Sequence, residues 1–116
     1  MARSYDGAES FAHSDVYYDE TLVDPTCAAS LLSYKYVIFF SNPANEMSRI
    51  NMTLRWSTNR GSNWDGAIQI WKKASGYSCL TAVPQASTSN ASIIGLVFEK
   101  GESLYYESIA FVKIQV

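Results

Sequence analysis

Two short stretches, SYDGAESF (residues 4–11) and STNRGSNW (residues 57–64), share one pattern and indicate the fold. Both fit Ser-x-Asp/Asn-x-Gly/Ala-x-Ser/Asn-aromatic. In such a turn the third residue can bond the backbone, the fifth can adopt a left-handed conformation, and the final aromatic, Phe11 or Trp64, can pack into a sheet. The two copies start about 50 residues apart, a spacing that suggests propeller blades. We therefore interpret both stretches as structural turns without a catalytic role.

The segments around these turns read as short strands, and none shows convincing helical periodicity. The clearest strand covers residues 50–57, where Ile50, Met52, Leu54 and Trp56 alternate with polar residues. Further strands are expected at residues 33–40, 67–72, 77–83, 93–99 and 106–114, with turn signals between them. This all-β pattern fits propeller blades, and its strand count alone would also allow an adhesion-type β-sandwich.

Composition limits the classes of protein. The 116 residues are 47% hydrophobic, enough for one folded domain. Nine basic residues stand against eleven acidic ones without a basic cluster, so we expect no nucleic-acid partner. We also expect no signal peptide, because the first fifteen residues lack an apolar stretch. Two cysteines, Cys27 and Cys79, allow either one disulfide or two buried thiols, and we favour the thiols.

Longer blocks carry a resemblance to a known family. RSYDGAESF, LVDPTCAAS, IFFSNPANEMSRINMTLRWS, SGYSCL, VFEKG and YYESIAFVKI resemble, in order and spacing, the C-terminal third of animal lysosomal sialidase, or lysosomal neuraminidase. The resemblance covers residues 3–114 and implies that the repeated turns are Asp boxes. Residues 1–116 would then form one partial domain, about two to three C-terminal blades of a six-bladed sialidase β-propeller. We interpret the chain as part of a longer enzyme.

The resemblance also implies a nucleophile. Sialic acid carries a carboxylate on its anomeric carbon, and this group repels an Asp or Glu nucleophile, whereas a phenol avoids the repulsion. Sialidases are accordingly the glycosidases with a Tyr nucleophile. Among eight tyrosines, the one in SGYSCL, Tyr77, matches this position.

Two further site residues follow from matched blocks. Arg49 matches one of three arginines that clamp the substrate carboxylate, a task that suits the planar guanidinium fork. The rival, Arg55, lies on the polar face of the 50–57 strand, and we interpret it as structural. Glu99 matches a glutamate that orients another arginine of the triad, and we prefer it to Glu107.

The function implied is that of an exo-α-sialidase, a retaining glycoside hydrolase that removes terminal α-linked sialic acids from glycoproteins, oligosaccharides and gangliosides. No metal or organic cofactor is implied. The acid/base aspartate, the glutamate that activates the tyrosine and two of the three arginines would lie in a preceding segment, so we expect the isolated chain to be inactive. The alternative is a catalytically dead, sialidase-like glycan-binding or structural fragment.

The resemblance extends to cellular context. The family implies a lysosomal location, with membrane or extracellular forms, and protective partners of the lysosomal carboxypeptidase type. The tyrosine-based sorting tail of vertebrate lysosomal sialidases is not found before the chain stops at Val116. Asn51 and Asn90 begin glycosylation sequons, and the first coincides with a sequon in the matched block.

Overall fold

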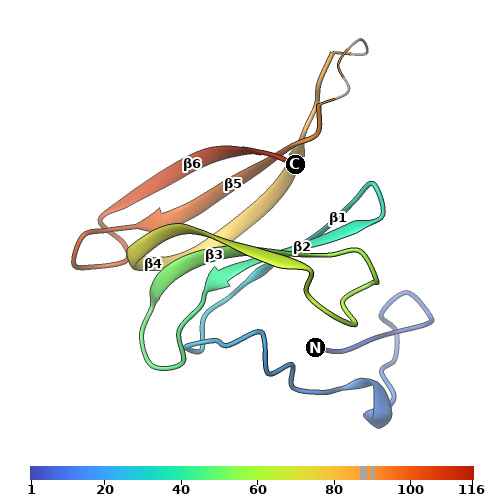
Figure 1. Ribbon diagram of the computed structural model, residues 1–116. Coiled ribbons are helices and arrows are strands. Elements are labelled where there is room, and N and C mark those ends of the chain that lie inside the picture. The colour runs from blue at the N-terminus through green and yellow to red at the C-terminus, as the bar shows by residue number, and fades with distance from the viewer. Residues whose placement is uncertain (87–88, 90) are drawn as a thin grey trace.

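The computed structural model describes residues 1–86, 89 and 91–116, and its fold is all-β (Figure 1). One short 3-10 helix, His13–Asp15, precedes six strands. The strands are β1 (Ser30–Tyr34), β2 (Val37–Pro43), β3 (Ile50–Ser57), β4 (Gly66–Val83), β5 (Ile93–Lys100) and β6 (Ser108–Gln115). The part of the chain described here contains no helix with the length and apolar character that crossing a membrane requires.

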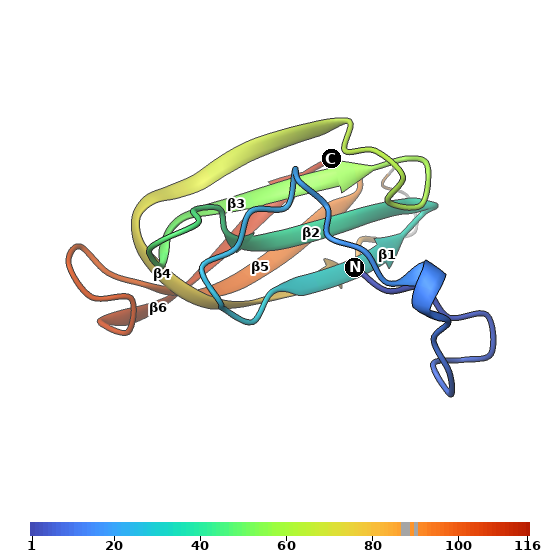
Figure 2. The same ribbon diagram turned by 90° about the horizontal axis from the view of Figure 1, so that it is seen from below.

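All six strands pair with their sequence neighbours, and every pair is antiparallel. β4 belongs to two halves of this curled sheet. Its first part pairs with β3, between Gly66 and Ala74, and its second part pairs with β5, between Ser75 and Val83. Figure 2 shows β4 curving around one end of the molecule, which brings β5 and β6 over the face of β1 to β3.

This arrangement confirms the prediction of blade-like sheets. The first half contains four strands, β1 to the start of β4, and the second contains the end of β4 with β5 and β6. β4 leaves the far edge of the first half and ends beside β1, where the Leu80 amide donates to Ser30 Oγ at 2.9 Å. A strictly sequential meander of this kind is typical of propeller blades, whereas β-sandwiches use Greek-key connections.

Two expected strand boundaries are wrong. The single strand expected at residues 33–40 is a hairpin, in which β1 and β2 meet at a tight turn formed by Lys35 and Tyr36. Both turn residues have positive φ, 50° and 66°, although neither is Gly, Asn or Asp, so the usual hairpin signal is missing. The strands expected at 67–72 and 77–83 are both parts of β4, because pairing passes directly from β3 to β5 without a loop.

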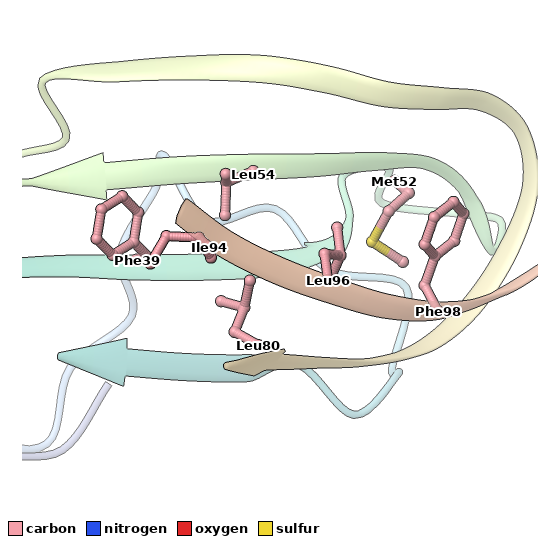
Figure 3. Packing of buried hydrophobic residues seen from close by; sticks show 7 residues of the cluster. All are labelled: Phe39, Met52, Leu54, Leu80, Ile94, Leu96 and Phe98. Carbon is pink, nitrogen blue, oxygen red and sulfur yellow. The ribbon is translucent and has the colours of Figure 1, made fainter. Parts of the chain in front are cut away.

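The core lies between the two halves of the sheet. Phe39, Met52 and Leu54 project from the first half and are at most 3% exposed. Figure 3 shows them facing side chains of the second half. The second-half members are Leu80, Ile94, Leu96 and Phe98. The alternation predicted for residues 50–57 therefore placed Met52 and Leu54 on the correct face.

The two repeated stretches fold as the same turn. In each copy the hydroxyl of the first residue accepts the amide proton of the fifth, and the side-chain oxygen of the third accepts that of the seventh. In each copy the fourth and fifth residues have positive φ. The four hydrogen bonds are Ala8 to Ser4 (2.9 Å), Ser10 to Asp6 (3.0 Å), Gly61 to Ser57 (2.9 Å) and Asn63 to Asn59 (2.9 Å).

The two copies differ in what surrounds them. Residues 57–64 join β3 to β4, and the Trp64 ring lies 5.7 Å from that of Phe40 on β2, as expected of an aromatic that packs into a sheet. Residues 4–11 precede β1 and adjoin none of the six strands, and Phe11 is 50% exposed. The expectation that Phe11 packs into a sheet is therefore wrong, because only an isolated bridge between Ala2 and Val16 flanks that turn.

The cysteines also differ from expectation. Both thiols are free, so there is no disulfide between Cys27 and Cys79. Cys79 is nevertheless exposed and Cys27 is only partly buried, which makes the prediction of two buried thiols wrong. On β4 the side chain of Leu80 points into the core, and strand alternation therefore turns its neighbour Cys79 outward.

Candidate functional site

The predicted site residues come together at one end of the sheet. Arg49 ends the connection between β2 and β3, Tyr77 lies in the part of β4 that pairs with β5, and Glu99 lies near the end of β5. In Figure 1 this end also contains the β5–β6 connection, while the turn of residues 57–64 lies at the opposite end of β3. The repeated turn is thus remote from Tyr77.

Arg49 lies against two aromatic rings. Its guanidinium carbon is 5.3 Å from the ring centre of Tyr77 and 4.9 Å from that of Tyr105, both within the range of cation–π attraction. One guanidinium nitrogen donates to the Thr26 carbonyl at 3.1 Å. Partial burial acts to lower the pKa of Arg49, but nearby Cys27, Tyr105 and Tyr77 outweigh it and raise that pKa.

Two backbone segments support Arg49. Asp24 accepts the amide protons of Thr26 and Cys27 at 2.9 and 3.3 Å, which shapes the loop whose carbonyl holds the guanidinium. The Arg49 carbonyl accepts the Ser75 amide proton at 2.9 Å, which ties it to β4 two residues before Tyr77. Partial burial raises the pKa of Cys27, and the Arg49 charge opposes this shift.

Tyr77 presents its ring to solvent. Its side chain is 52% exposed and borders a shallow, open pocket of about 190 Å³, lined also by Ser78, Cys79, Val97, Phe98, Glu99 and Ile109. This volume is below the ~300 Å³ at which typical small-molecule sites begin. A larger apolar cavity of about 480 Å³ lies between the sheet halves beside Phe39 and Leu54. It does not include Arg49, Tyr77 or Glu99, so we do not assign the site to it.

The two glutamates considered from sequence have different contacts. Glu99 Oε2 accepts the amide proton of Tyr77 at 2.8 Å. Glu107 Oε2 accepts the amide protons of Glu102 and Ser103 within the β5–β6 connection. Glu99 is therefore the glutamate that contacts the predicted nucleophile, through its backbone.

Arg55, the rival of Arg49, lies near the other end of β3. Burial lowers the pKa of Arg55, and the charge of Asp19 opposes this effect. In the described part of the chain its buried Nη1 atom has no hydrogen-bond partner. The structure does not bring Arg55 to Tyr77.

The two sequons are differently placed. The Asn51 side-chain nitrogen, which a glycan would occupy, donates to the Ala44 carbonyl at 2.9 Å. Glycosylation of Asn51 stays a prediction, and Asn90 lies outside the described residues.

Sequence reasoning missed Tyr105 and Thr26, which both contact Arg49. Tyr105 belongs to the matched block YYESIAFVKI, and this was the available signal. Thr26 contributes only a backbone carbonyl, which no side-chain pattern reveals. Together the described groups form a fixed cation beside an exposed phenol, an arrangement suited to binding a carboxylate next to a nucleophile.

The fold is that of a segment of an antiparallel β-propeller, and the contact between Arg49 and Tyr77 at one end is its candidate site. Comparison with known proteins shows similarity to sialidases. The chain is 31% identical over 116 residues to the sialidase of Micromonospora viridifaciens, with 91% of this chain and 17% of that protein covered. A solved structure described as Hadza microbial sialidase Hz136 superposes with a TM-score of 0.65 at 25% identity, covering 83% of this chain and 19% of the other.

No protein-family model matches the chain. The sequence and structural matches nevertheless agree, and the chain is homologous to sialidases over most of its length. It spans about a sixth of the length of the sialidase it matches.

Proposed function

We propose that this chain supplies the nucleophile and one arm of the carboxylate clamp of an exo-α-sialidase. The observation that carries the proposal is the contact between the Arg49 guanidinium and the Tyr77 ring. Homology to two sialidases supports the same conclusion, because it makes sialic acid the expected ligand. The residues required for the rest of the reaction would come from a preceding segment.

The proposed chemistry uses the two residues in sequence. Arg49 binds the sialic acid carboxylate through paired charge-assisted hydrogen bonds. The Tyr77 oxygen, after losing its proton to a base from another segment, forms a bond to the anomeric carbon. The bond from that carbon to the leaving group breaks, and the leaving-group oxygen takes a proton from an acid. Water then hydrolyses the glycosyl–tyrosine bond, with overall retention of configuration.

The finer assignments follow the resemblance to the animal lysosomal enzyme. We propose glycoproteins, oligosaccharides and gangliosides as substrates, a lysosomal location with membrane or extracellular forms, and a lysosomal carboxypeptidase-type protein as partner. The second candidate is a catalytically dead glycan-binding fragment. It is favoured by the open pocket of about 190 Å³, which suits weak binding better than enclosure of a reacting sugar.

Replacing Tyr77 tests the proposed nucleophile. In a longer chain that supplies the preceding part of the propeller, Tyr77→Phe keeps KM for a fluorogenic sialoside near its original value but lowers kcat at least a hundredfold. The carboxylate clamp remains intact, so only the covalent step is lost. Tyr36→Phe is the matched control, since Tyr36 is 98% exposed in the β1–β2 turn.

An unchanged kcat in Tyr77→Phe contradicts the assignment of Tyr77 as nucleophile. A longer chain that binds the sialoside but shows no turnover with Tyr77 in place favours the binding fragment. The 116-residue chain alone is expected to show no turnover. Turnover by this chain that disappears on Tyr77→Phe would contradict the need for a preceding segment.

A further inference from the structure

A β-bulge lies at Tyr77. Ser75 on β4 is paired with Lys100 on β5, and the next pair joins Ser78 to Phe98. Two residues of β4, Gly76 and Tyr77, therefore stand opposite the single residue Glu99. Bulges of this two-against-one form bend a strand and redirect side chains, and they recur beside active sites.

The Glu99 side chain closes this bulge. The extra residue in a bulge leaves backbone groups without ladder partners. Here the Tyr77 amide donates instead to Glu99 Oε2 at 2.8 Å. The acceptor is a carboxylate, so the hydrogen bond is of the stronger, charge-assisted kind.

Gly76 provides the space that the carboxylate occupies. A Cβ atom at Gly76 would lie 2.2 Å from Glu99 Oε2 and 2.9 Å from a ring carbon of Tyr105. Both distances are well inside van der Waals contact, and Gly76 itself is buried. Any other residue at position 76 would displace the Glu99 carboxylate or the Tyr105 ring.

The contacts of this bulge reach both partners of the site. The Tyr77 ring lies 5.3 Å from the Arg49 guanidinium, and Tyr105, which contacts the same guanidinium, is the second neighbour of Gly76. The Ser75 amide, at the start of the bulge, donates to the Arg49 carbonyl at 2.9 Å. The backbone geometry at residues 75–77 thus determines how the phenol and the cation face each other.

We propose that Glu99 is a positioning residue for Tyr77: its carboxylate accepts the Tyr77 amide proton and holds the bulge that sets the ring beside Arg49. The catalytic consequence rests on the function proposed above, whereas the positioning itself does not. This role differs from orienting a triad arginine. It needs a hydrogen-bond acceptor at Oε2, which glutamine retains, while orienting an arginine needs the negative charge.

Hydrogen exchange of the Tyr77 amide in the 116-residue chain tests the positioning. Exchange is measured by mass spectrometry with residue-level fragmentation on Glu99→Ala and Glu99→Gln. Glu99→Ala should lower the protection of this amide about tenfold or more, the effect of losing a hydrogen bond to a charged group. Glu99→Gln should lose less protection than Glu99→Ala, because its amide oxygen can still accept the bond. The Leu80 amide, which donates to Ser30 Oγ, is the internal control.

Two further variants complete the test. Gly76→Ala should lower the protection of the Tyr77 amide as Glu99→Ala does, since the added methyl displaces the carboxylate without removing it. If Glu99→Ala does not fold, the result for Gly76→Ala tests the proposal by itself. Glu107→Gln is the matched glutamate control and should leave the Tyr77 amide unchanged. Unaltered Tyr77 protection in both Glu99→Ala and Gly76→Ala overturns the proposal. Equal losses in Glu99→Gln and Glu99→Ala overturn it also, because charge rather than the acceptor would then matter.

Kinetics in the longer, active chain test whether the bulge held by Glu99 matters for catalysis. Glu99→Ala should lower kcat more than it changes KM. Glu99→Gln should retain at least about a tenth of the kcat of the unmodified chain. A kcat equally low in both variants contradicts positioning through the acceptor. If Tyr77→Phe keeps full kcat, the proposed function fails, and the exchange experiment still decides whether Glu99 holds the bulge.

Discussion

Arg49 shows how several weak contacts fix one side chain. The side chain of Arg49 contacts two aromatic rings and donates to one backbone carbonyl, and the backbone carbonyl of Arg49 accepts from Ser75. These contacts restrict a residue that has many rotamers in isolation. Fixing the guanidinium before a ligand arrives reduces the entropy lost on binding. The planar group is needed for this, because it can contact a ring face and still direct hydrogen bonds to a carboxylate.

Substitution of Arg49 should therefore affect binding above all. In a longer chain with the complete site, Arg49→Ala should weaken binding of free sialic acid about tenfold or more, because the carboxylate loses its paired charge-assisted hydrogen bonds. Arg49→Lys should lose less affinity, since it keeps the positive charge but not the planar guanidinium. Titration calorimetry measures both.

Arg60→Lys is the control for this measurement, because Arg60 is exposed in the turn at the opposite end of the sheet. Wild-type affinity in Arg49→Ala would show that Arg49 does not bind the carboxylate.

The role of Arg49 could be predicted from its sequence block, but its contacts with Tyr105 and Thr26 could not. They lie 56 and 23 residues away in the chain, and only folding brings them together.

At the scale of elements, the repeated turn is the feature most completely specified by local sequence. Its side-chain oxygens bond amides within the same eight residues, so the turn requires no distant partner. The copy at residues 4–11 keeps this geometry even though no named strand flanks it. Strand boundaries behave differently: residues 50–57 were predicted correctly, while the hairpin at Lys35 and Tyr36 was missed because its residues carry no local turn signal.

The first turn should respond to acid. Hydrogen bonds from the Ser10 and Ser4 hydroxyls, and from the Ser10 amide, lower the pKa of Asp6 from 3.8 to about 2. A pKa that is lower in the folded state means that ionised Asp6 stabilises the turn fully above pH 3.8. This contribution is lost as the pH falls toward 2. The carboxyl carbon signal of Asp6 in a ¹³C NMR titration should therefore show a midpoint near 2.

Asp6→Asn provides the control for this titration, because it makes the first turn resemble the second, where Asn59 occupies the same position and does not titrate. In that variant the Ser10 amide signal should no longer shift between pH 4 and 2. A midpoint at the ordinary 3.8 in the unmodified chain would mean that the Ser4 and Ser10 bonds do not persist in solution.

At the scale of the whole molecule, one face of the second sheet half remains uncovered. Val97 and Phe111 are direct partners on β5 and β6, and Ile109 lies two residues from Phe111 on the same face. These side chains are 39%, 52% and 76% exposed. Contiguous apolar surface beside a strand edge favours association between chains.

The isolated chain should therefore self-associate at micromolar concentration. Phe111→Lys should shift it toward the monomer, because a charge in the centre of the apolar face must be desolvated when two chains meet. Size-exclusion chromatography with light scattering measures the mass of both forms. Leu104→Lys, in the β5–β6 connection, is the matched control and should associate like the unmodified chain. A wild-type chain that stays monomeric at about 100 µM contradicts this view of the exposed face.

The sequence by itself determined the local features: the all-β class, the repeated turn, the alternating strand at residues 50–57 and the blocks that resemble sialidase. Each depends on residues close together in the chain, where side-chain type and backbone preference act directly. Only the tertiary structure decided that β4 joins two sheet halves and that Glu99 closes a bulge at Tyr77. It also decided that two tyrosines contact Arg49. These features depend on strand register, and register is set by which faces are buried against each other across the whole sheet.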